Sequence, residues 1–170
     1  MRTTRVAVLA LVTVTTVAVF AAGGSGGSTV TARHAPPLTV GATGRTSGFA
    51  VTVHDTFDGW GLPSSGLVPR SGTRWVALLL SVENVSGRER RWDTALAVSM
   101  AGPVAGDYDV INVVDPDGLT VWLRSVRLAA GGVASGLVLF EVPGDADRLR
   151  LWVRGSSSAV GVRFDVGGGR

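Results

Sequence analysis

Cysteine is absent from this chain of 170 residues, which excludes disulfide bonds and thiolate metal ligands. The same absence excludes a bacterial lipid anchor attached through a cysteine thioether. Without cysteine, the two histidines, His34 and His54, give no convincing set of three or four zinc ligands. The sequence therefore predicts no cofactor, and a domain of about 120–150 residues buries enough surface to fold without a cross-link.

Lysine is absent as well, so all sixteen basic residues are arginine, set against thirteen acidic residues. Removal of an N-terminal segment containing Arg2 and Arg5 would leave fourteen arginines against thirteen acids. No basic stripe with interleaved aromatic residues is present, whereas nucleic acids are bound through many cationic contacts with phosphates. Nucleic acid is therefore not an expected partner.

The N-terminus has the pattern of an export signal. Arg2 and Arg5 precede an apolar run over residues 6–22, and small residues follow over 23–28. This order predicts a signal peptide over 1–22. An uncleaved anchor is the alternative, because the apolar run is close to the lower limit of about 17–25 residues for a spanning helix. Both interpretations predict an extracellular or cell-envelope location, with membrane contact only through this segment if it is kept.

Two further regions follow the signal. Residues 23–47 are rich in glycine, serine, threonine and proline, which predicts a flexible, disordered tether. Residues 48–168 then alternate apolar and other side chains with the period of two that is typical of β-strands. The alternating sets are Phe49, Val51 and Val53; Val76, Leu78, Leu80 and Val82; Trp92, Thr94, Leu96, Val98 and Met100; Ala134, Val138, Phe140 and Val142; Leu149, Leu151 and Val153; Val160, Val162, Phe164 and Val166.

Seven to eight such strands, separated by glycine and proline turns, predict an all-β, immunoglobulin-like two-sheet β-sandwich. The strand around Leu78 should be central, because its other face, with Trp75, Ala77 and Leu79, is apolar too. The cysteine pair that joins the sheets of antibody domains is missing. Trp92 is predicted to fill the centre of the sandwich in its place.

Two segments resemble a known family. Residues 74–87 form a strand that ends in an Asn-x-Ser-Gly turn, and residues 126–143 combine Leu-Ala-x-Gly-Gly with Gly-x-x-x-Phe-Glu-Val-Pro. This combination is similar to a family of secreted bacterial, actinobacterial immunoglobulin-like domains of unknown function, related to immunogenic mycobacterial extracellular antigens. The resemblance implies a sandwich from Phe49 to Val166. It implies no catalytic residues, because the matched positions are turn and core residues.

Ligand-binding candidates are two tryptophans and two arginines. Trp152 lies between Arg150 and Arg154 in the alternating pattern and should face away from the core, where an indole can stack on a ligand. Trp60 lies in a predicted loop and could do the same. The structural alternatives are packing of arginine on the Trp152 indole and a Trp60 ring that covers the open end of the sandwich.

A weak calcium alternative rests on four aspartates, Asp107, Asp109, Asp115 and Asp117, because calcium prefers closely spaced oxygen ligands. Asp115-Pro116-Asp117-Gly118 is also an ordinary turn sequence, which is the favoured interpretation, so no metal is predicted.

No converging acid–base pair is found, so the predicted function is not enzymatic. The preferred prediction is an exported domain that binds an envelope or extracellular protein, or another surface ligand. The alternative is a carbohydrate-binding module that uses Trp60, Trp152 and Tyr108 as stacking platforms.

Overall fold

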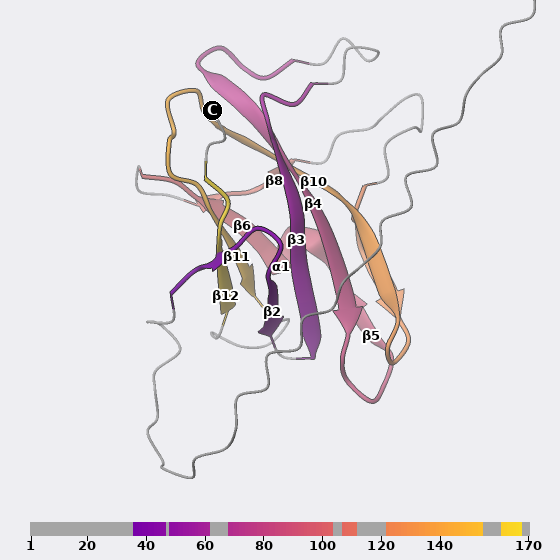
Figure 1. Cartoon of the computed structure of the whole chain (residues 1–170). Coiled ribbons are helices and arrows are strands. Elements are labelled where there is room, and N and C mark those ends of the chain that lie inside the picture. Colours follow the sequence, from indigo (N-terminus) through magenta and orange to yellow (C-terminus); the bar gives the residue numbers. More distant parts are fainter. Residues whose placement is uncertain are drawn as a thin grey trace, which may run out of the picture. The chain divides into compact units, whose positions relative to one another are not determined.

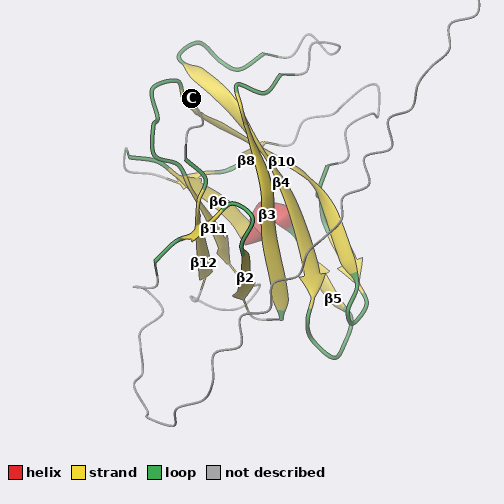
Figure 2. Ribbon diagram, viewed as in Figure 1, coloured by secondary structure: helices red, strands yellow, loops and turns green. Residues whose placement is uncertain are grey.

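The computed structural model describes residues 36–46, 48–61, 68–103, 107–111, 122–154 and 161–167. All of them belong to the unit Thr31–Arg170. These residues are almost entirely β-structure, with one short helix, drawn red in Figure 2. The elements are β1 (Leu38–Thr39), β2 (Thr43–Thr46), β3 (Phe49–Asp58), β4 (Thr73–Asn84), β5 (Arg90–Trp92), α1 (Thr94–Ala97), β6 (Val98–Ala101), β7 (Asp107–Tyr108), β8 (Val110–Ile111), β9 (Val126–Leu128), β10 (Val133–Pro143), β11 (Arg150–Arg154) and β12 (Gly161–Asp165).

Two sheets form the layers of a β-sandwich, as the alternation predicted. Sheet A has the strand order β1-β12-β11-β6-β7, and sheet B has the order β2-β3-β4-β10-β8. Figure 1 shows β3, β4 and β10 as long adjoining strands, with β6, β11 and β12 in the other layer. The central position of β4, between β3 and β10, is confirmed. A separate two-stranded sheet pairs β5 with β9.

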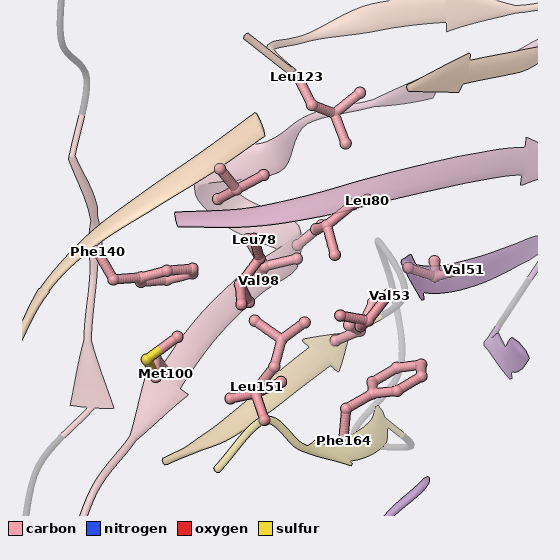
Figure 3. Packing of buried hydrophobic residues seen from close by; sticks show 14 of the residues in the cluster. Val51, Val53, Leu78, Leu80, Val98, Met100, Leu123, Phe140, Leu151 and Phe164 are labelled. Carbon is pink, nitrogen blue, oxygen red and sulfur yellow. The ribbon is translucent and has the colours of Figure 1, made fainter. Parts of the chain in front are cut away.

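The core lies between the sheets and consists of the predicted alternating residues. Sheet B contributes side chains such as Val51, Leu78 and Phe140, and sheet A contributes Leu151 and Phe164. Figure 3 shows these side chains pointing toward one another from the two layers. Burial of aliphatic and aromatic side chains, each worth about 1.5–3 kcal/mol, is therefore the principal force that holds the sheets together.

The sandwich includes residues that the sequence analysis assigned to the tether over 23–47. β1 pairs in parallel with β12 of sheet A, and β2 pairs antiparallel with β3 of sheet B. The turn between them needs Gly41, whose φ is 90°. Gly44 then lies so close to Val162 and Phe164 that a Cβ there would overlap them. The small residues that resemble a linker are thus required by close packing.

The predicted alternation from Trp92 to Met100 is interrupted, which corrects the sequence analysis. The chain leaves the β5–β9 pair after Trp92, makes the single turn α1, and enters sheet A as β6. The turn is fixed by a hydrogen bond from Ala97 N to Asp93 O and by one from Trp92 Nε1 to Thr94 Oγ1. As a result Leu96, which the alternation places with Trp92, is 80% exposed.

Candidate functional site

Sheet B carries an apolar patch on its outer face, away from the core. Because side chains alternate along a strand, β4 points Val76 and Leu78 inward and Trp75 and Ala77 outward. In a β-sandwich the outer face of each sheet is ordinarily polar. An apolar outer face on sheet B, in addition to its apolar inner face, is therefore unusual. We call it the tryptophan patch, and its members are Trp60, Trp75, Ala77, Ile111, Trp122, Leu137 and Leu139.

Two half-buried tryptophans form the surface of the tryptophan patch. Trp60 follows β3, and its backbone N donates to the carbonyl of Trp75 over 3.1 Å. Trp122 forms a parallel bridge with Leu137 of β10, the strand that also pairs with β4 and β8. The two rings meet edge to face, with centroids 5.5 Å apart and planes at 83°. Two residues separated by 62 positions in the sequence thereby form one aromatic surface, which packs against the buried cluster of Trp75, Ala77 and Leu139.

The tryptophan patch contains hydrogen-bond donors without acceptors. Trp75 is only 6% exposed, and the buried Nε1 atoms of Trp75 and Trp122 have no hydrogen-bond partner within the described residues. An unsatisfied buried donor costs about 1–3 kcal/mol. Buried polar groups are nearly always paired in native proteins. In the part of the chain that the structure describes, the Trp152 indole on sheet A is unpaired as well, so the tryptophan patch differs in holding two such donors in one cluster.

A row of hydroxyl groups lies beside the tryptophan patch on the same outer face. Four residues in register across four strands form this hydroxyl row: Thr43, Thr52, Ser81 and Ser135. The Oγ1 atoms of Thr43 and Thr52 lie 2.7 Å apart. His54 occupies a β-bulge and shares a 2.8 Å hydrogen bond between its Nε2 and Ser81 Oγ. This part of the sheet therefore offers both donors and acceptors to a ligand.

The outer face of sheet A holds the other predicted tryptophan. Guanidinium groups of Arg163 and Arg154 lie 4.3 and 5.7 Å from the centre of the Trp152 ring. The ring covers Gly161, where a Cβ would overlap the indole. Arg163 is directly opposite Trp152 in the β11–β12 register, so the packing is cross-strand. Among the described residues, the guanidinium groups over the ring are those of Arg163 and Arg154, not that of Arg150. This arrangement matches the structural alternative for Trp152.

The predicted ligand residues therefore do not form one site. Trp60 belongs to the outer face of sheet B, whereas Trp152, Arg150 and Arg154 are on β11 of sheet A. Tyr108, the third predicted stacking platform, packs against the main core from β7. The sequence analysis did not identify Trp75 and Trp122 as site residues. The signal for Trp75 was present in the two apolar faces of its strand, which was interpreted only as central burial.

The structure describes two of the four calcium candidates. Asp107 forms a salt bridge with Arg154, with 2.8 Å between Asp107 Oδ2 and Arg154 Nη2. Asp109 is exposed. Asp115 and Asp117 lie outside the described residues. Among the described side chains, no group of three or more histidine, aspartate or glutamate residues is placed to hold a metal ion.

Glu141 has the most perturbed carboxylate among the described residues, and the cause is structural. Hydrogen bonds from Arg70 and Thr73 lower its pKa to about 2, and the Arg70 guanidinium forms a salt bridge with it at 3.1 Å. The Arg70 backbone N also donates to this carboxylate. These contacts fasten the turn before β4 to the end of β10, so the perturbed pKa marks a structural link rather than a catalytic group.

Glu141→Gln is expected to destabilise the protein at pH 7 and to have no effect near pH 2. Since the folded-state pKa is below the ordinary value of 4.5, the stabilisation is present above about pH 4.5 and is lost as the pH falls through about 2. Melting curves should show a lower Tm, by about 2–4 °C, at pH 7 only. Arg70→Gln is the matched control and should give the same pH dependence. An equal shift at both pH values would contradict the assignment.

The chain matches no protein-family model, and no curated protein sequence is significantly similar to it. Its structure resembles the predicted lipoprotein ycdA of Bacillus subtilis, with a TM-score of 0.59 and 11% identity over 74% of this chain; the chain spans only 38% of ycdA. The yjhA protein of B. subtilis gives a TM-score of 0.56 at 10% identity, covering 76% of this chain and 98% of yjhA.

The secreted protein MPT63 of Mycobacterium tuberculosis gives a TM-score of 0.51 at 14% identity, covering 77% of this chain and 98% of MPT63. At these identities the likeness establishes the fold alone. The predicted β-sandwich is confirmed, and the predicted resemblance is supported at the level of fold by this mycobacterial secreted protein. In the described ranges, no helix has the length and apolar character to cross a membrane.

Proposed function

We propose that the protein is an exported, non-catalytic β-sandwich domain that binds an envelope or extracellular protein, or another surface ligand, through the outer face of sheet B. The tryptophan patch is the observation that carries the proposal. Trp75, Ala77 and Leu139 are buried, and the half-buried Trp60 and Trp122 are the part of the patch that a partner can reach. Tryptophan is prominent among the residues that dominate binding energy. The Trp60–Trp122 pair provides such an anchor on a rigid sheet.

Export and family are part of the same proposal. The N-terminal pattern over residues 1–28 supports export, and similarity to the fold of a secreted protein and of a predicted lipoprotein agrees with an extracellular or envelope location. The proposal includes kinship with the secreted actinobacterial immunoglobulin-like domains. The non-catalytic role is part of the same proposal, in which His54, hydrogen-bonded through Nε2 to the Ser81 hydroxyl, belongs to the binding surface.

A binding assay with matched variants tests the proposal. The full chain is mixed with a delipidated cell-envelope fraction of the producing organism, and the retained fraction is measured. Trp60→Ala/Trp122→Ala should weaken retention about tenfold or more, because aromatic anchors dominate interfaces. Arg150→Ala/Trp152→Ala, on sheet A, is the control and should bind like wild type. Equal binding by all three proteins, or no binding by any, would contradict the proposal, provided that circular dichroism shows each variant folded.

A further inference from the structure

The polar groups around the tryptophan patch narrow the chemistry of its ligand. In the described part of the chain, the buried indole N–H groups of Trp75 and Trp122 have no acceptor. A ligand that bears oxygen atoms and moves the rings of Trp60 and Trp122 on binding can pair with them. A purely apolar ligand, such as an acyl chain, would leave both indole N–H groups unpaired. The free-energy cost of these unsatisfied donors would then remain. The ligand is therefore expected to combine apolar surface with hydrogen-bonding oxygen.

The hydroxyl row is within reach of the same ligand. Leu79 and Leu137 are opposite each other in the register, Trp122 bridges to Leu137, and the pair Ser81–Ser135 is the next outward pair along β4 and β10. Rows on one face of a sheet are two residues apart, or about 6.6 Å. A ligand that stacks on Trp122 therefore meets the serine hydroxyls directly beside it.

The charges around this surface favour an uncharged ligand. The tryptophan patch and the hydroxyl row contain no charged residue. The charges on the same outer face are of both signs: Arg45 and Glu83 are both opposite Ala50, and Glu141, opposite Trp75, is paired with Arg70. With Asp55 opposite Leu79, the carboxylates slightly outnumber the arginines and give no cationic surface for an anionic polymer. They can accept hydrogen bonds from ligand hydroxyls instead.

We propose that this surface binds a neutral polysaccharide chain, whose sugar rings stack on Trp60 and Trp122 and whose hydroxyls bond to Ser81, Ser135 and His54. The inference rests on the proposed function and gives the ligand of the same face. Sugars combine apolar C–H faces with hydroxyl groups, which is the combination that this surface presents. The sequence analysis placed carbohydrate stacking on Trp60, Trp152 and Tyr108. The proposed site keeps Trp60 and lies entirely on the outer face of sheet B.

Chemical treatment of the envelope fraction separates the sources of binding. Periodate, which cleaves vicinal diols of sugars, should abolish retention of the full chain, and exhaustive protease digestion of the envelope should leave retention unchanged. Retention should also be unchanged in about 0.5 M NaCl, because salt at this concentration strongly screens contacts between exposed charges and a neutral ligand does not depend on them. Loss of retention after protease, resistance to periodate, or loss in salt would each overturn the polysaccharide proposal. Absence of retention on the untreated envelope would instead contradict the proposed function itself.

A titration with released polysaccharide tests the residues. The probe is the neutral polysaccharide fraction of the same envelope, freed of charged polymers by anion exchange, and tryptophan fluorescence is the readout. Trp60→Ala/Trp122→Ala should weaken binding about tenfold or more, and Ser81→Ala/Ser135→Ala about threefold to tenfold. Trp152→Ala is the control and should bind like wild type. Unchanged affinity in both sheet B variants, or no fluorescence change with wild type, would overturn the proposal.

Discussion

Asn84→Ala is expected to lower the free energy of unfolding by about 3–5 kcal/mol. Asn84 is 0% exposed at the end of β4, and its Nδ2 donates to the carbonyls of Arg88, Leu128 and Ala129 over 2.7, 2.8 and 3.0 Å. Its Oδ1 accepts from the backbone N and the hydroxyl of Ser86. Alanine would leave these partners without their hydrogen bonds, in a domain whose total stability is only about 5–15 kcal/mol. Urea denaturation measures the loss.

Asn84→Asp provides the control for this interpretation. The carboxylate keeps the acceptor for Ser86 but places negative charge against three carbonyl oxygens in a buried position. Burial and these oxygens should raise the pKa of the introduced carboxyl in the folded state above its unfolded value of about 3.9. The stability of Asn84→Asp relative to wild type should therefore be greatest below about pH 4 and should fall as the pH rises. The same difference from wild type at pH 4 and at pH 7 would contradict the proposed role of the amide.

Asn84 also shows why the motif that carried the family resemblance predicts fold rather than activity. The Asn-x-Ser-Gly turn meets the turn around Gly131, where Asn84 N and O bond to Gly132 and Gly131. Both sequence motifs thus meet in one structural link between β4 and β10. The turn residues of the two motifs are needed for this geometry. The strands of the same two segments carry members of the tryptophan patch, such as Trp75 and Leu137, and of the hydroxyl row, Ser81 and Ser135.

Local alternation was sufficient to predict the layers of the fold. The period of two identifies which side chains of β3, β4, β10, β11 and β12 enter the core, because burial requires every second residue to be apolar. It could not predict where a strand bends. The turn at α1 depends on the Trp92–Thr94 hydrogen bond. β1 pairs with β12, which lies far along the chain, although β2 pairs with the next strand, β3.

The candidate site was predicted only in part, because its geometry depends on strand register. Trp60 was identified, but its partner Trp122 is 62 residues away and no local pattern links them. The same limit explains why Arg163, not Arg150, stacks closest to Trp152, since the β11–β12 register determines that contact. The sequence identifies residues that are able to stack, whereas the strand order and register determine which of these side chains are in contact.

Trp92→Ala is the second large effect that we expect, about 3–5 kcal/mol of destabilisation. Trp92 is 1% exposed, meets Phe49 edge to face at 5.2 Å, and donates from Nε1 to Thr94 Oγ1 over 2.9 Å. Trp92 is buried in the main core of this cysteine-free chain, and it packs beside Phe49 at the start of β3, where β4 ends, rather than at the centre that the sequence analysis predicted. Trp92→Phe keeps most of the buried surface and should cost less, as should Thr94→Val, which removes the acceptor of the indole N–H.

Leu96→Ala is the comparison that separates the structure from the sequence pattern. The alternation gives Trp92 and Leu96 the same orientation, so a continuous strand would make both substitutions strongly destabilising. In the structure α1 turns Leu96 outward to 80% exposure, and its truncation should change the free energy of unfolding by less than about 0.5 kcal/mol. Urea denaturation of the two variants side by side measures the difference. Comparable losses would mean that the chain passes from β5 into β6 without the helical turn, and that Leu96 contributes to the core.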